Sequence, residues 1–382
     1  MAYGSSNSVA PGQEAGRPQP QTSVEAPGGP FIRHSQPGRA PQYVSTLGSG
    51  SGFGAVITQP LVARPGYFRN FRIQQQVSGT TGTVVAAADA PYSLNSLIQL
   101  KDAFGTPLCV APGYEVANLI GLYGGGFGVN NGSNLASNLP SWSAFSAAGN
   151  FTMSYAIPLE FSKGYGVLSG ANASLLPTLQ FNLGASSAIY TSGATTTATT
   201  IQTTVSSDFY WLPEAVAVEP PGLGTTRQWI LQQANPSIAS ASSSRVQFPR
   251  LGGYLDTIIM EVRDSTGART DQAWPTGRFQ LYVDGVPLLD TTMNELYDDM
   301  WIQFGGVARP TGVVAVSRKT SLNQQSLGLL DTGETLLSTN PGTLLEANFS
   351  PAGTITNSPA TMSVLVGQIV PTGASIQGLP EV

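Results

Sequence analysis

The sequence predicts an all-β protein with two domains, and three observations support this prediction. The chain has 382 residues, which is more than a single domain usually holds. It contains 44 glycines and 28 prolines, so turns are frequent and long helices are disfavoured. Hydrophobic residues reach 41% while charged residues make up only 10%, a balance that permits a large core and argues against a disordered polymer.

The first segment of the chain, residues 1–42, is expected to form a flexible arm rather than a domain. It holds six glycines and seven prolines and few bulky apolar residues. Its densest apolar pair, Phe31 and Ile32, is the expected anchor. Such an arm gains order on contact with a neighbour or a membrane, so we expect it to act in assembly and to contribute little to folding.

Residues 43–218 are predicted to form the first domain, because apolar and polar residues alternate with the period of a half-buried strand. The clearest alternating segments are residues 70–77, 151–157 and 201–211. The last of these is expected to place four residues on one buried face, namely Ile201, Val205, Phe209 and Trp211. Two glycine-containing segments, 102–105 and 121–128, are expected to be turns or loops.

A connector is predicted over residues 212–224, where paired prolines cannot donate backbone hydrogen bonds to a central sheet. We place the domain boundary there and predict a second domain over residues 219–382. Strand alternation restarts after the connector, most clearly in residues 257–263, 279–284 and 362–366. The two parts are similar in length and texture but share no residue-level repeat, so any duplication is one of architecture.

One segment of the second part, residues 292–304, has a helical period. Its apolar residues recur at intervals of three and four and form one stripe, made of Met293, Leu296, Tyr297, Met300 and Phe304. Thr292 and Glu295 form a capping box, and Gly305 with Gly306 ends the helix. Asp298 and Asp299 then fall in mid-helix, where we expect them to be solvated rather than a catalytic pair.

Composition excludes several kinds of site. The single histidine, His34, and the single cysteine, Cys109, cannot build a zinc site or a disulfide within one chain. Cys109 is expected to be a small apolar strand residue. The net charge is −5 and no basic run occurs, so direct nucleic-acid binding is not expected. No signal peptide or membrane-spanning run is seen, and a reducing cytosol is a permitted site of synthesis.

The sequence contains no complete catalytic motif. Residues 329–333 read Leu-Leu-Asp-Thr-Gly, as in aspartic proteases, but that chemistry needs two aspartates and Asp331 has no second motif. We therefore interpret this segment as a turn. A Ser-His-Asp catalytic triad would have to use His34, and the flexible arm is a poor place to hold an imidazole in register. The glycine-rich segments 48–54 and 121–128 fit no phosphate-binding pattern. The prediction is no catalytic, cofactor-binding or metal residue, and no cofactor.

The layout resembles the double jelly-roll major capsid protein of tectivirus-like, membrane-containing icosahedral phages, whose relatives include the adenovirus hexon. The resemblance is strongest at Phe151–Leu159, which is similar to an aromatic strand of the family's first roll closing on Pro-Leu. It continues through the segments 176–183 and 201–211, the Pro-Pro-Gly connector, and the 292–304 helix followed by residues 312–316. It covers nearly all of residues 43–382, whereas the Gly/Pro-rich arm departs from the family's helical N-terminus.

The resemblance implies a fold and a function. The fold would be two consecutive eight-stranded jelly rolls with long loops and one short helix in the second roll. The function would be a structural, non-enzymatic capsid protein of the virion, made in the host cytoplasm, whose homotrimers form pseudo-hexagonal capsomers of an icosahedral shell. Its partners would be itself, neighbouring capsomers, penton or minor capsid proteins, and the inner membrane through the arm. Five arginines are candidates for lipid contact, namely Arg33, Arg39, Arg64, Arg69 and Arg72.

Two other functions are compatible with the residues. A trimeric receptor-binding fibre or adhesin would share the β texture and the Ser/Thr/Gly richness, although it would more often show repeats. A β-sandwich enzyme acting on glycans would need a carboxylate pair in an aromatic cleft. The mass in solution separates a trimeric capsomer from a monomeric hydrolase, and electron micrographs separate compact blocks from rods.

Overall fold

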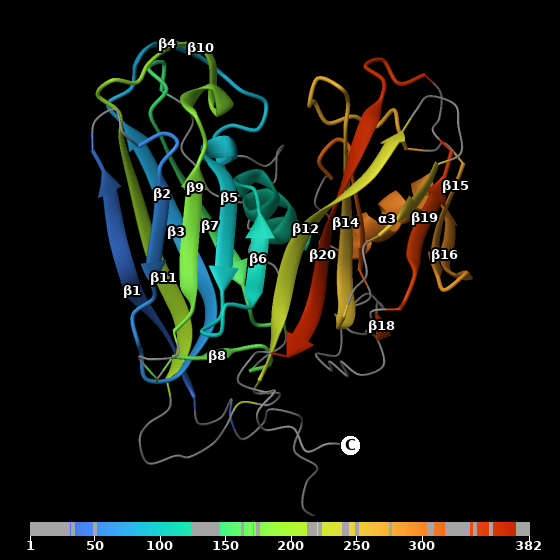
Figure 1. Ribbon diagram of the computed structural model, residues 1–382, viewed down its shortest axis with the longest axis horizontal. Helices are drawn as coiled ribbons and strands as arrows, with labels where there is room; N and C mark the ends of the chain where they lie inside the picture. The colour runs from blue at the N-terminus through green and yellow to red at the C-terminus, as the bar shows by residue number, and fades with distance from the viewer. Residues whose placement is uncertain are drawn as a thin grey trace, which may run out of the picture.

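The fold is described from a computed structural model, in which strands dominate and two β-sandwich units lie side by side (Figure 1). The residues that the structure describes are 31, 35–48, 52–123, 146–161, 164–170, 172, 176–211, 220, 224–238, 244–248, 252–274, 277–303, 309–317, 337–338, 342–350 and 354–371.

The first unit consists of two facing sheets whose strands interleave along the chain. One sheet has the order β1 (Gln36–Leu47), β11 (Thr200–Trp211), β3 (Tyr67–Ser78) and β7 (Phe151–Pro158), with β8 (Leu168–Ser169) beside β3. The facing strands are β2 (Val56–Pro60), β9 (Thr178–Leu183), β5 (Asn95–Lys101) and β6 (Pro107–Ala111). Counting these framework strands along the chain and leaving β8 aside, one sheet reads 1-8-3-6 and the other 2-7-4-5, which is the order of a jelly roll.

The second unit repeats this order. One sheet is formed by β12 (Thr225–Ile238), β20 (Ala360–Pro371), β14 (Tyr254–Arg263) and β17 (Val313–Ser317), with β18 (Leu337–Ser338) beside β14. The facing sheet is formed by β13 (Ser244–Gln247), β19 (Leu345–Phe349), β15 (Arg278–Val283) and β16 (Val286–Thr292). Leaving β18 aside, the strand numbers are again 1-8-3-6 and 2-7-4-5, so the expected architectural duplication is present in the described strands.

Each roll carries a helical segment between its fifth and sixth strands. In the second roll this is α3 (Met293–Gln303), as the sequence predicts. The capping box is formed, because the Thr292 amide donates to Glu295 Oε2 at 2.9 Å and the Glu295 amide donates to Thr292 Oγ1 at 3.3 Å. Met293, Leu296 and Met300 are buried, Tyr297 is half-buried, and Phe304, Gly305 and Gly306 lie outside the described residues.

The helical segment of the first roll was not predicted. It comprises the π-helical turn η2 (Glu115–Ile120) and the short α2 (Gly121–Tyr123). The expectation of a loop over residues 121–128 is therefore wrong for residues 121–123, and residues 124–128 lie outside the described part of the chain. Every residue of η2 and α2 is buried.

The smaller elements lie at the ends of the strands. β4 (Thr81–Ala86) and β10 (Tyr190–Thr195) form a two-stranded ribbon at one end of the first roll, whereas β20 ends at the opposite end of the molecule (Figure 1). The 3₁₀ turns η1 (Tyr92–Leu94) and η3 (Ser186–Ala188) lie in the loops that accompany this ribbon.

The N-terminal boundary differs from the predicted one. β1 begins at Gln36 and pairs with β11 from Gln36 opposite Trp211 to Leu47 opposite Ile201. Upstream, Phe31 is 1% exposed and packs edge-on against Tyr67 and Tyr210. Residues 36–42 thus belong to the first roll and not to a free arm, because β1 completes the hydrogen bonding of β11 on that side.

The last residues of β11 depart in part from the predicted burial. Ile201 and Val205 are fully buried as expected, but the register with β3 shifts between Asp208 and Phe209. The extra residue is Arg69 of β3, and β11 itself continues without interruption, so Phe209 packs against the same core as Ile201 and Val205. Tyr210 is buried in a separate cluster with Phe31 and Tyr67. Phe209 is half-buried against the predicted core, whereas Trp211 at the end of the strand is 39% exposed, so the prediction of a buried Trp211 is wrong.

Candidate functional site at the junction of the two rolls

The two rolls are joined by a continuous sheet. β6 of the first roll pairs in parallel with β12 of the second, with Cys109 opposite Trp229 and Val110 opposite Ile230. One sheet consequently runs through both rolls in the order β17-β14-β20-β12-β6-β5-β9-β2, and β6 and β12 meet in the middle of Figure 1. The junction is therefore made of backbone hydrogen bonds as well as side chains.

Buried side chains pack around this pairing. Trp229 is fully buried, and a Cβ added at Gly367 would lie 2.6 Å from its ring, so glycine leaves the room that the indole occupies. Cys109 is fully buried in β6, which confirms that it is a small apolar strand residue. Burial raises the pKa of the Cys109 thiol to about 12, so the thiol is neutral at ordinary pH and is not a nucleophile.

Polar side chains also tie β12 to the first roll. Thr226 Oγ1 donates to the carbonyl oxygen of Gly166 at 2.8 Å, and the Gln228 amide donates to the carbonyl oxygen of Pro107. The Gln368 amide of β20 in turn donates to Gln228 Oε1. These contacts fix the first residues of β12 against two separate segments of the first roll.

A buried ion pair lies beside the joining strand. Arg227 in β12 binds Asp256 in β14, and their side chains are only 1% and 0% exposed. The Arg227 guanidinium also lies 5.2 Å from the centre of the Trp229 ring. Because this pair is enclosed, its role is to hold β12 and β14 in place rather than to bind a ligand from solvent.

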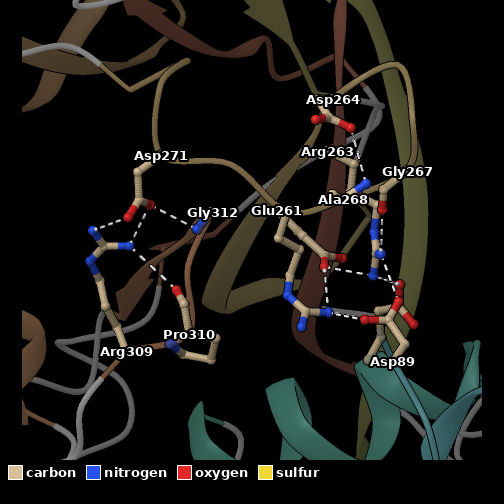
Figure 2. A network of polar contacts seen from close by, with 12 residues as sticks. Asp89, Glu261, Arg263, Asp264, Gly267, Ala268, Asp271, Arg309, Pro310 and Gly312 are labelled. Carbon is tan, nitrogen blue, oxygen red and sulfur yellow. Dashed lines mark hydrogen bonds and ion pairs between the residues drawn. The ribbon is translucent and has the colours of Figure 1, made fainter. Parts of the chain in front are cut away.

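The most highly charged part of the junction lies where the loop before η1 and the start of η2 meet β14. Asp89 of the first roll receives two arginines of the second: Arg263 Nη1 donates to Asp89 Oδ2 at 2.6 Å, and Arg269 donates to Asp89 Oδ1 (Figure 2). The Arg269 guanidinium lies 4.0 Å from the centre of the Tyr114 ring. The two guanidiniums therefore lie against the Tyr114 ring and donate to the Asp89 carboxylate.

Two more carboxylates converge on this cluster from opposite rolls. Glu261 Oε1 in β14 lies 2.8 Å from Arg263 Nη2, and Glu115 Oε1 in η2 lies 3.9 Å from the same nitrogen. Glu115 is 6% exposed and Glu261 is 1% exposed. Burial and the neighbouring Glu115 charge raise the pKa of Glu261 to about 8, and burial likewise raises the pKa of Glu115.

A second ion pair lies within the second roll. Arg309 donates to both carboxylate oxygens of Asp271, at 2.8 and 3.0 Å, and the Gly312 amide donates to Asp271 Oδ1 at 2.7 Å (Figure 2). The Arg309 guanidinium also stacks 3.9 Å from the centre of the Tyr297 ring on α3. This group fixes α3 to the loops next to it.

Several residues considered from the sequence have no described position. His34, Arg33 and residues 329–333 with Asp331 lie outside the described residues. Asp298 and Asp299 are exposed on α3, as predicted. Among the residues with described positions, no group of three or more His, Cys, Asp or Glu side chains could hold a metal ion.

Three of the five candidate lipid-binding arginines have carboxylate partners in this chain. Arg39 and Arg72 both bind Asp208, at 2.6 and 2.7 Å, and Arg69 binds Glu160. Arg64 donates to the carbonyl oxygen of Pro41. Their positive charge is consequently offset in part within the first roll.

The junction residues were missed by the sequence analysis. The alternation over residues 257–263 only placed Glu261 on the strand face opposite Ile258, Met260 and Val262. β14 is instead buried on both faces from Leu255 to Val262, and at Glu261 the buried Glu115 of the first roll lies next to it. A signal was present, since Asp256 and Glu261 interrupt an otherwise apolar run in a chain that has few charges.

Comparison with known proteins identifies solved structures of the same fold. No protein-family model matches the chain, and no curated protein matches it. The major capsid protein of STIV, the Sulfolobus turreted icosahedral virus, aligns with a TM-score of 0.59 at 15% identity, over 88% of this chain and 99% of that one. The major capsid protein of bacteriophage PM2 aligns with a TM-score of 0.50 at 10% identity, over 88% and 99% of the two chains.

A third structure, the Faustovirus major capsid protein, aligns with a TM-score of 0.50 at 8% identity, over 88% of this chain and 90% of that one. At identities this low, the structural alignments establish the fold, and function has to be argued separately. Together with the two sets of strands in jelly-roll order, they show that the chain is a double jelly roll.

Proposed function

We propose that this chain is a structural major capsid protein whose trimers form the pseudo-hexagonal capsomers of an icosahedral viral shell. The observation that carries the proposal is the joining of two jelly rolls of identical strand order into one block by the β6–β12 pairing. The likeness to the major capsid proteins of STIV and PM2 along nearly their whole length supports it.

A rigid junction suits this role. If each subunit supplies two of the six corners of a pseudo-hexagon, the angle between its rolls sets the shape of the capsomer and hence of the lattice. The junction holds that angle with a continuous sheet, the buried Trp229 and several ion pairs, rather than with a linker.

The outer face of the first roll suits contact with a neighbouring subunit. Across β1, β11, β3 and β7, one outward row consists of Val44, Thr204, Gln74 and Ser154, and the next consists of Thr46, Gln202, Gln76 and Thr152. These two rows contain no charged residue, so covering them costs less free energy than covering ionised groups would. The face therefore fits a surface that is buried in an assembly.

A structural role without enzymatic activity fits the described side chains. The buried carboxylates Glu115 and Glu261 are enclosed between the rolls, and Cys109 is held as a neutral thiol. The proposed partners are further copies of this chain, together with penton or minor capsid proteins and a membrane beneath the shell. Within the described residues, no helix is both long and apolar enough to cross a bilayer.

The proposal is tested by the size and shape of the purified protein. Analytical ultracentrifugation should give three times the 39.8 kDa chain mass, and electron micrographs should show compact blocks that assemble into closed shells. A monomer would favour the alternative of an enzyme that acts on glycans. Trimeric rods that never close into shells would favour a fibre or adhesin.

A further inference from the structure

The charged cluster at the junction contains more acids than bases. Three carboxylates meet there, from Asp89, Glu115 and Glu261, and two guanidiniums meet them, from Arg263 and Arg269. With every group ionised, the cluster carries one uncompensated negative charge, and its two glutamates are buried. A buried charge without a partner is costly, so such a cluster takes up a proton instead.

The position of that proton follows from the contacts. Asp89 accepts hydrogen bonds from Arg263 and Arg269, so both of its oxygens are occupied. Glu115 Oε2 and both carboxylate oxygens of Glu261 accept no hydrogen bond from the described residues, although Glu261 Oε1 is ion-paired with Arg263. A proton held between Glu115 and Glu261 supplies a hydrogen bond for these oxygens and makes the cluster neutral.

We propose that Glu115 and Glu261 share one proton across the junction, and that losing it loosens the first roll from the second. The two carboxylates belong to different rolls, so their repulsion on deprotonation acts directly on the contact between η2 and β14. This is a property of the single chain and does not depend on its assembling into a shell.

The neighbouring groups are compatible with this proposal. Tyr114 and Asp89 face the pair from the first roll, and Arg263 and Arg269 face it from the second. On the strands that flank β14, the residues opposite Glu261 are uncharged, namely Ser363 on β20 and Val313 on β17. No further described base next to Glu261 compensates the extra charge, so the shared proton is what balances the cluster.

The sign of the pH dependence follows from linkage. The pKa of both carboxylates is raised in the closed junction, so the closed state binds a proton that an open, hydrated junction releases near the ordinary glutamate pKa. The closed junction is therefore favoured at low pH and becomes less favoured as pH rises toward about 8. For one proton, the ratio of open to closed junctions grows roughly tenfold per pH unit in this range and then levels off.

Hydrogen exchange of the full chain measures this opening. After correction for the intrinsic exchange rate, protection of peptides covering residues 113–118 and 258–271 should fall roughly tenfold per pH unit between pH 6 and 8. Protection of peptides far from the junction, such as those covering β15 and β16, should stay constant. In the Glu261→Gln variant, protection at the junction should be independent of pH, since the amide neither titrates nor adds a charge.

Two further variants make the test decisive. Glu115→Gln should abolish the pH dependence in the same way, because replacing either carboxylate removes the excess negative charge for which the shared proton is needed. Glu346→Gln is the matched control, because a hydrogen bond from Arg245 lowers the pKa of Glu346 and its ionisation is complete throughout pH 6–8. Equal pH dependence in the unmodified protein, Glu261→Gln and Glu346→Gln would overturn the proposal, as would protection in the unmodified protein that does not change with pH.

Discussion

At the scale of single residues, the second roll depends on charges that are cut off from water. Arg227 and Asp256 are enclosed, so each neutralises the other where neither could be hydrated. Asp256→Asn would leave the guanidinium buried beside a neutral amide, and we expect it to lower the free energy of unfolding by about 3–5 kcal/mol. Urea denaturation followed by tryptophan fluorescence measures this change.

An exposed pair in the same roll provides the control. Arg278 binds Asp290 at 2.9 Å, with the two side chains 69% and 30% exposed. Because water and ions screen this pair, Asp290→Asn should cost about 1 kcal/mol or less. Similar losses for the two variants would mean that Asp256 is hydrated and that the burial of the Arg227 pair does not determine its contribution.

Sequence reasoning succeeds for residues whose surroundings follow from local pattern. Cys109 lies in an apolar strand segment and is buried, and Asp298 and Asp299 lie on the polar side of a helix and are exposed. Glu261 is different, because alternation assumes that one face of a strand meets solvent. That assumption fails where a second roll covers the other face, and no local pattern reports such a cover.

At the scale of elements, α3 depends on its buried stripe. Leu296 is 3% exposed, whereas Asp299 is exposed on the other side of the helix. Leu296→Ala should lower the free energy of unfolding by about 2–5 kcal/mol through lost burial and a residual cavity. Asp299→Ala should change it little, and a thermal melt of both variants would contradict the helix orientation if their melting temperatures fell equally.

The first strand gives a second test at this scale. A chain that begins at Gln42 lacks the buried Phe31 and the first half of β1, so β11 loses partners from Trp211 to Ser206. We expect its melting temperature to fall clearly, contrary to the expectation of an arm that is dispensable up to residue 42. A chain that begins at Pro30 retains both features and is the control; its melting temperature should equal that of the full chain.

Elements were predictable where a periodic pattern stands alone. The strands β3, β7 and β11 and the helix α3 each show their period in the sequence. The helical segment η2–α2 does not, because it is buried on all sides and so lacks a polar stripe, and because the glycines after Gly121 indicate a loop. The burial of Tyr210 is likewise set by Phe31, which lies far from β11 in the chain and leaves no signal in the sequence of β11.

At the scale of the whole molecule, the two rolls share one core. A single cluster of buried apolar side chains extends from Ile57 in β2 to Val366 in β20, and it crosses from roll to roll around Cys109 and Trp229. The sequence predicts two domains and a connector, but the parallel pairing of β6 with β12 joins segments far apart in the chain and leaves no local signal. The connector itself, residues 212–219 and 221–223, lies outside the described residues.

This shared core predicts that the rolls unfold together. Differential scanning calorimetry at pH 6 should give one transition whose calorimetric and van't Hoff enthalpies agree.

Asp89→Ala removes the carboxylate that binds Arg263 and Arg269 without touching either roll's core. The two rolls should then become less coupled, and the van't Hoff enthalpy should fall below the calorimetric one. Asp271→Ala breaks a comparable pair with Arg309 inside the second roll and should lower the melting temperature while the two enthalpies still agree. Two separate transitions in the unmodified protein would show that the junction does not bind the rolls into one cooperative unit, and a capsomer would then need its neighbours to fix the angle between them.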